Sequence, residues 1–371
     1  MCKNLAAMLL AASLISPAFA QGAAAAASAP AAAASAPLKV AYLYVSPVVH
    51  AGWTQQHEAA RREVQEAFGA RVQTTTVEDV PEGADAERVL RDLARQGNQM
   101  IFATSYGYSR AVLAVAKEFP QVKFECLTCP QGAPNVATAN ARYYEGRYLA
   151  GIAAGRTSQT HVAGYVAGFP IPEVLQGINA FALGMRSVDP QAQVKVIWLN
   201  EWFNPTRERE AALALIGQGA DVLAFHTGSV AVMTTAEERG KLAIAYHSDM
   251  RESAPTAQLL AITHQWGTYE KSRVQAMLDG RWQPGNVWSG IREGIVKVGD
   301  FGPKTPPAVQ QEVLAREKDI ADGTLAPFKA GAAPVRDNEG NIRIPAGEAL
   351  SDAQILQMNW LAEGVQGRIG R

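Results

Sequence analysis

Residues 164–190, GYVAGFPIPEVLQGINAFALGMRSVDP, place a large aromatic side chain where it could meet a ligand. The stretch begins as a buried strand over 161–167, made of small and branched residues. The sequence Phe169-Pro-Ile-Pro cannot continue a ladder, and apolar residues then recur at helical spacing over 174–185. Phe169 is therefore predicted at the carboxyl end of a strand, where open α/β sheets bind ligands. The alternative is a core phenylalanine that caps the sheet.

Other residues able to contact a ligand also lie at predicted strand ends or just beyond them. An aromatic face can stack on a flat ring, and hydroxyl, imidazole and carboxylate groups can bond its polar edge. The turns after parallel strands converge at one rim of a sheet, so these side chains could share one ligand. The candidates are Trp53, Ser105, Tyr106, Trp202, His226, Thr227 and Trp266.

Each of these residue types also has an ordinary structural role. Ser105 could be an N-cap of the turn that follows it. His226 could be a hydrogen-bonded side chain without a ligand, and Trp202 could anchor a loop by aromatic burial.

Motifs for catalysis and cofactor binding are missing from the sequence. It contains no G-x-S-x-G, no H-E-x-x-H and no G-x-x-x-x-G-K-[ST]. Glu208 and Glu210 alternate around a predicted helix and do not form an acid/base pair. We therefore expect no catalytic residue, no cofactor and no metal.

The pair Cys126 and Cys129 could close a small disulfide in an oxidising compartment. Zinc would need two more ligands, and no second C-x-x-C is present. A thioredoxin-like role is disfavoured because Pro130 and Gly132 follow the pair where a helix should open.

The first residues resemble an export signal. Lys3 precedes an apolar run over 5–15, and Ala18-Phe19-Ala20 fits a cleavage site, which predicts a signal peptide over 1–20 cut after Ala20. A membrane anchor needs about 20 apolar residues, so the run is too short to be one. Residues 21–37 are almost all Ala, Ser, Gly and Pro, which is typical of a flexible spacer. We expect export to the periplasm.

Strand-like and helix-like segments alternate through most of the chain. The first series has strands over 39–45, 72–77, 100–104, 122–126 and 136–139, and helices over 55–68, 85–96, 110–118 and 142–154. The second has strands over 162–167, 194–199, 222–225, 242–246 and 259–262, and helices over 173–186, 206–218, 230–239 and 269–278. This alternation predicts two parallel-sheet lobes of α/β class.

Length and charge agree with that architecture. The chain has 371 residues, and the part after the spacer exceeds one usual core. We expect lobe 1 over 38–158 plus 264–291, lobe 2 over 159–263 plus 292–325, and a C-terminal tail over 326–371 that packs on the lobes.

A cleft between two such lobes is a favoured ligand site, and hinges let the lobes close on a ligand. A net charge of −1 gives no reason to expect nucleic-acid binding.

Several ordered motifs resemble the basic membrane protein family of substrate-binding proteins, which serve ABC importers. They are KVAYLYV at 39–45, Gly52-Trp53 opening a helix, NARYYEGRYLAG at 140–151, the stretch 164–190, FKA at 328–330, DNEG at 337–340 and QMNWLAEGV at 357–365. The resemblance covers residues 38–367. It implies a type I periplasmic-binding-protein fold, with two doubly wound parallel-sheet lobes joined by hinge crossovers.

The resemblance also implies a ligand and its contacts. Family members bind purine nucleosides, and PEGADAER at 81–88, FPIPEV at 169–174 and VIWLN at 196–200 resemble a branch that binds a free purine base, with adenine expected. Trp53 and Phe169 stand at or near the family's two stacking aromatics, and Asp249 stands where an Asp binds the ligand. The alternative for Asp249 is an N-cap of the turn that follows it.

Two departures from the family pattern disfavour ribose. Gln265-Trp266 replaces a basic residue that meets the sugar, and the turn at 105–110 lacks an expected Asp. The resemblance implies a monomer that passes a purine base or nucleoside to a permease in the inner membrane. The alternative is a periplasmic nucleosidase, for which only Asp249 and Glu173 are candidate carboxylates.

Overall fold

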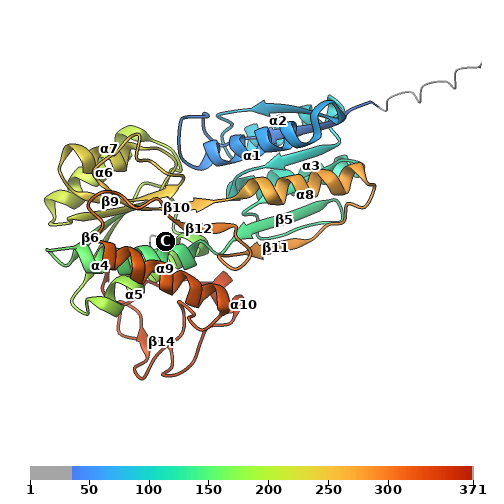
Figure 1. The fold of residues 1–371 in the computed structure, drawn as a ribbon. Helices are drawn as coiled ribbons and strands as arrows, with labels where there is room; N and C mark the ends of the chain where they lie inside the picture. The colour runs from blue at the N-terminus through green and yellow to red at the C-terminus, as the bar shows by residue number, and fades with distance from the viewer. Residues whose placement is uncertain (1–35, 370–371) are drawn as a thin grey trace, which may run out of the picture. The chain divides into compact units, whose positions relative to one another are not determined.

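Two α/β lobes make up most of residues 36–369, the part of the chain that the computed structural model describes (Figure 1). Both lobes belong to the single compact unit that starts at Pro37. The expected signal peptide over 1–20 and nearly all of the expected spacer over 21–37 lie outside the described residues.

The sheet of the first lobe has the strand order β11-β5-β4-β3-β1-β2, and all neighbours are parallel. Its strands are β1 (Leu38–Leu43), β2 (Val72–Val77), β3 (Met100–Ala103), β4 (Lys123–Leu127), β5 (Val136–Ala141) and β11 (Asn286–Ser289). Its helices are α1 (Trp53–Phe68), α2 (Ala84–Arg95), α3 (Ser109–Glu118) and α8 (Trp266–Leu278), with short 3-10 turns η1 (Gly69–Arg71) and η2 (Tyr106–Tyr108).

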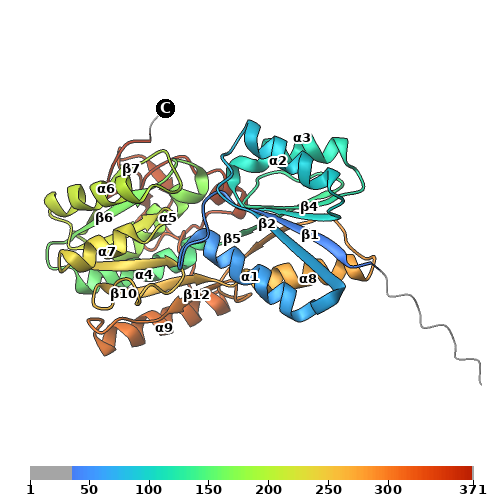
Figure 2. The same cartoon turned by 90° about the horizontal axis from the view of Figure 1, so that it is seen from above.

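Alternate residues of β1 enter two different hydrophobic cores. Val40 and Tyr42 pack with the core that contains α1 and α8, whereas Ala41 and Leu43 pack with α2 and α3. Both faces of the strand are therefore covered, which explains its continuous apolar sequence. Figure 2 shows α1 and α8 on one side of this sheet and α2 and α3 on the other.

The second sheet has the order β12-β10-β9-β8-β6-β7-β15, in which only β12 is antiparallel to its neighbour. Its strands are β6 (Val162–Ala167), β7 (Gln193–Trp198), β8 (Val222–His226), β9 (Leu242–His247), β10 (Gln258–His264), β12 (Val296–Gly299) and β15 (Val365–Gln366). Helices α6 (Pro205–Gly217) and α7 (Ala231–Glu238) cover one face, and α4 (Tyr143–Thr157), α5 (Pro172–Val188) and α9 (Pro307–Asp322) the other (Figure 1).

The C-terminal segment packs on the second lobe through α5. Asn179 donates to the carbonyl of Trp360 at 2.8 Å and accepts from the amide of Ala362 at 2.7 Å. The segment contains the hairpin β13 (Val335–Arg336) and β14 (Ile342–Ile344), the helix α10 (Asp352–Leu356), and β15, which extends the sheet beside β7.

The predicted α/β architecture is confirmed, with local corrections. Strands β11 and β12 and helix α9 were not predicted. The two strands have only four residues each, and the apolar residues of α9 lie among polar and charged ones. Cys126 and Cys129 form the disulfide that their spacing allowed.

The expected first-lobe range of 38–158 must be corrected, because α4 packs with the second lobe. Gly151 of α4 approaches the carbonyl of Phe181 in α5, and Gly184 of α5 approaches the carbonyl of Tyr148 in α4. Neither position has room for a Cβ atom, so the two helices are joined as one layer. The chain thus crosses to the second lobe between β5 and α4, before the expected crossing near residues 156–161.

The two lobes touch across the cleft between their sheets. The amide of Gly52 donates to Ser248 Oγ at 2.8 Å, and His50 Nε2 lies 2.7 Å from Ser253 Oγ. Gly52 also faces the carbonyl of Gly228 so closely that a Cβ atom would collide with it. The structure therefore holds the lobes closed, and this closure requires a glycine at position 52.

We expect Gly52→Ala to hold the lobes apart. Gly219→Ala is the control, since the two glycines have φ values of +100° and +99° and only Gly52 has a neighbour within 4 Å of the added Cβ. Backbone strain should cost each variant on the order of 1–3 kcal/mol of unfolding free energy. Small-angle X-ray scattering should give a larger radius of gyration for the Gly52 variant alone. Equal radii for the two variants would contradict this account of closure.

Candidate functional site

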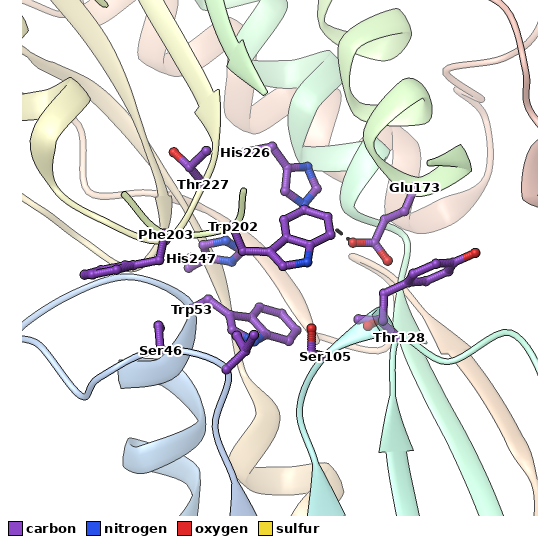
Figure 3. A pocket seen from close by; sticks show the side chains of 13 residues that line it. Ser46, Trp53, Ser105, Thr128, Glu173, Trp202, Phe203, His226, Thr227 and His247 are labelled. Atoms are coloured by element: carbon purple, nitrogen blue, oxygen red, sulfur yellow. Dashed lines mark ion pairs between the residues drawn. The ribbon is translucent and has the colours of Figure 1, made fainter. Parts of the chain in front are cut away.

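A pocket lies between the lobes, at the carboxyl ends of strands from both sheets (Figure 3). This is the edge at which parallel α/β sheets bind ligands. The first lobe contributes Val45, Ser46, Trp53, Ser105, Tyr106 and Thr128, and the second contributes Glu173, Trp202, Phe203, His226, Thr227, Gly228 and His247.

Four aromatic rings form a continuous wall of this pocket. The ring centroids of Trp53 and His247 are 5.3 Å apart, those of His247 and His226 are 6.1 Å apart, and those of His226 and Trp202 are 6.1 Å apart. The two indoles thus end a wall whose middle consists of two imidazoles. Such a wall suits a flat ligand with apolar faces and polar edges.

Trp53 is the first residue of α1 and is fixed by the first lobe. Its Nε1 donates to the carbonyl of Thr104 at 2.8 Å, and the ring of His57 packs against it at 4.4 Å. Trp266 does not line the pocket and is only 1% exposed, which corrects its expected ligand contact. It opens α8, and the packing of α8 against α1 buries its indole behind Trp53 and His57.

Trp202 comes from the loop after β7 and is fixed by a bond to the other lobe. Its Nε1 donates to Glu82 Oε1 at 3.1 Å, and the same carboxylate accepts from Ser105 Oγ and from the amide of Gly107. Phe169 does not line the pocket, which corrects its expected place as the opposite stacking aromatic. It packs edge-on against Trp202 at 4.8 Å, so Trp202 covers it from the pocket side.

Two hydroxyl groups at the pocket donate their hydrogens to carboxylates of the protein. Ser105 donates to Glu82, and Thr227 Oγ1 donates to Glu208 Oε2 at 2.8 Å. Both oxygens keep lone pairs, so they can accept hydrogen bonds from a ligand. Tyr106, in the turn η2, lines the pocket as expected from its place after β3.

Glu173 brings a carboxylate to the pocket and was not among the ligand contacts predicted for a binding protein. It lies in the first turn of α5, with Oε1 3.5 Å from His226 Nε2 and Oε2 accepting from Asn140 Nδ2 at 2.9 Å. Burial lowers the pKa of His226, and Glu173 opposes this only in part. Burial therefore favours the neutral form of the His226 imidazole.

Asp249 lies outside the pocket, so its expected ligand contact is corrected. Its exposed carboxylate accepts from Arg251 at 2.6 Å and from Gln258 at 2.8 Å. Partial burial raises the pKa of Asp249, but these hydrogen bonds outweigh it and the net pKa is lowered. Asp249 therefore stabilises its own turn by accepting these hydrogen bonds.

His247 and Thr128 line the pocket and were missed by the sequence prediction. Both have positive φ, +73° for His247 and +64° for Thr128, as does Asn200 near Trp202 at +57°. Side-chain-bearing residues rarely adopt this conformation, and it often marks functional sites. The only available signal was that each residue follows a predicted strand.

Residues 36–369 contain no group of three or more His, Cys, Asp or Glu arranged to hold a metal ion. No helix in the same range is long and apolar enough to cross a membrane.

Comparisons with known proteins agree with this architecture. Residues 38–328 match a family model described as Bmp, ABC transporter substrate-binding protein PnrA-like. A purine-binding protein of Brucella abortus is 45% identical over 332 residues, covering 90% of this chain and 94% of the relative. A Haloferax volcanii relative, whose name describes an ABC transporter glucose-binding protein, is 33% identical and covers 90% and 81%.

A solved structure has the same fold. The ABC transporter solute-binding protein of Conexibacter woesei superposes with a TM-score of 0.63 at 19% identity, covering 78% of this chain and 98% of that one. Because the family model spans most of the sequence, the chain belongs to the Bmp family of PnrA-like ABC transporter substrate-binding proteins.

Proposed function

We propose that this protein binds a free purine base, adenine above all, in the pocket between its lobes and delivers it to an ABC permease. The observation that supports this most directly is the wall of two indoles and two imidazoles with a carboxylate beside it. The 45% identical relative is named as purine-binding, which supports the same ligand class.

Stacking would supply much of the affinity. In the proposed complex the base lies between Trp53, held by the first lobe, and Trp202, tied to Glu82. A base stacked on an aromatic side chain gains about 1–3 kcal/mol, whatever the base. The indoles therefore account for binding a flat heterocycle but not for choosing among purines.

The polar edge would choose the ligand. Ser105, Thr227 and Glu173 can all accept hydrogen bonds in the pocket, since their own donors are used elsewhere or absent. Adenine offers an amino group and a ring N–H as donors. A ligand lacking these donors would leave the buried acceptors without partners, which is costly.

The cellular role follows from the family. We propose that residues 1–20 direct export and are removed after Ala20, and that the mature protein works in the periplasm as a monomer. It would release the purine unchanged to an inner-membrane permease and would not bind nucleic acid. Its pocket residues have no arrangement that we would assign to a nucleosidase.

Analysis of copurified small molecules tests the ligand class. We expect mass spectrometry of freshly purified, denatured protein to detect a purine. Calorimetry should then show binding of adenine, weaker binding of adenosine and inosine, and none of glucose. After long incubation the nucleosides should be recovered intact by chromatography. Binding of glucose in preference to every purine would overturn the proposal, and released base would indicate an enzyme.

Replacement of the aromatic residues tests the stacking wall. We expect Trp202→Ala and Trp53→Ala each to weaken adenine binding by about 1–3 kcal/mol. Phe169→Ala serves as the control because Phe169 packs behind Trp202 and does not line the pocket, so it should cost less. Calorimetry measures the affinity of each variant for adenine. A larger loss of affinity in the Phe169 variant than in the Trp202 variant would show that Phe169 forms the wall.

Two carboxylate-to-amide substitutions test the polar edge. Glu173→Gln removes a charge that lines the pocket, and we expect a loss of about 1.5–3 kcal/mol in adenine binding, typical of a hydrogen bond to a charged group. Asp249→Asn makes the same chemical change at an exposed site outside the pocket and should leave the affinity unchanged. If the two variants lose equal affinity, Glu173 is not the group that reads the base.

A further inference from the structure

A second histidine lies behind His247, sealed inside the second lobe. His264 ends β10 and is 1% exposed, and its Nδ1 is 3.1 Å from Nδ1 of His247. This bond leaves Nε2 as the ring nitrogen of His247 that can meet a ligand in the pocket. Nε2 of His264 is buried and has no hydrogen-bond partner among the described residues.

The bond between the two rings couples their tautomers. Burial lowers the pKa of both histidines well below the usual value, so both rings are neutral. Each neutral imidazole carries one N–H, and a hydrogen bond between the facing nitrogens needs one of them to donate and the other to accept. The ring that donates through Nδ1 has a bare Nε2, and its partner carries its proton on Nε2.

Arg147 of α4 supplies a charge that distinguishes the two arrangements. It is fully buried and forms no ion pair with any carboxylate in residues 36–369. Its Nη2 donates to the carbonyl of Phe225 at 2.6 Å, and its guanidinium carbon lies 3.3 Å from the ring centroid of Tyr246. That ring is in turn 5.1 Å from His264 and 4.0 Å from His247.

The positive charge of Arg147 favours a lone pair, and not an N–H, on Nε2 of the buried His264. With His264 protonated on Nδ1, its Nε2 carries no hydrogen, so a buried N–H without an acceptor is avoided on a ring that the charge of Arg147 reaches. The opposite arrangement would leave an N–H without an acceptor on a ring already subject to that positive charge. The same choice puts the proton of His247 on Nε2, toward the pocket.

We propose that Arg147, acting through His264, fixes the tautomer of His247 so that its Nε2–H is presented to the ligand as a hydrogen-bond donor. His247 is then a specificity-determining residue, and His264 and Arg147 are positioning residues. This inference rests on the proposed purine site. It requires that a ring nitrogen of the ligand accept a hydrogen bond from His247. The pocket would combine this donor with the acceptors Glu173 and Ser105.

Nitrogen NMR of the ligand-free protein tests the tautomers directly. In protein labelled with 15N-histidine, long-range proton–nitrogen correlations should show His247 protonated on Nε2 and His264 on Nδ1. The reverse pattern in the native protein overturns the inference without any substitution. Arg147→Lys should keep the native pattern, because it keeps the charge, whereas Arg147→Met should shift His247 toward the other tautomer.

Ligand analogues test the consequence for binding. We expect one of 1-deaza-, 3-deaza- or 7-deazaadenine to bind about tenfold more weakly than adenine, the effect of one lost hydrogen bond. In His264→Phe this penalty should shrink, while the melting temperature reports whether the ring replacement is tolerated. Equal affinity for adenine and all three analogues would overturn the inference. Failure of the native protein to bind any purine would instead overturn the proposed function and leave the NMR result standing.

Discussion

Close contact between the two lobes along the line where they meet is the constraint on which the site depends. Gly52 lies against the backbone of Gly228, and Trp202 of one lobe bonds to Glu82 of the other. These contacts bring together strand ends from two sheets and cover their polar groups. In such surroundings each hydrogen bond that a ligand fails to make has a high cost. Closure therefore turns a collection of ordinary side chains into a selective surface.

The sequence predicts the fold well because the fold depends on repeated patterns. Apolar strands that alternate along the chain with amphipathic helices predict parallel sheets covered on both faces. Strand β1 is an example, since its successive residues enter two different cores. The boundary at α4 could not be read in the same way. Whether α4 joins the first or the second sheet depends on contacts such as Gly151 with Phe181, which lie far apart in sequence.

The site was predicted only to the level of which turns carry it. Of the residues predicted to contact a ligand, six line the pocket: Trp53, Ser105, Tyr106, Trp202, His226 and Thr227. The direction of a side chain within a turn is a different matter. His247, with φ of +73°, enters the pocket, while Asp249 two residues later pairs with Arg251 in solvent. Trp266 shows the same limit, because the packing of α8 decides where its indole points.

Two buried charges in this protein show how structural and ligand-directed groups differ. Glu125 is sealed in the first lobe, yet its carboxylate accepts from Tyr269, Arg273 and Trp282, all within 2.7 Å. Every partner is internal, so the group needs nothing from outside. Arg147 has one carbonyl partner and lies over two aromatic rings, and two of its nitrogen atoms have no hydrogen-bond partner among the described residues.

A buried charge with few partners is expensive, and the expense is understandable if the charge organises groups that reach the ligand. The histidine pair provides that connection. His247 lines the pocket, and its ring lies beside the Tyr246 ring on which Arg147 packs. Stacking on the two indoles would by itself be enough for affinity. In the proposed function, the polar cluster behind them selects among flat ligands that stack equally well.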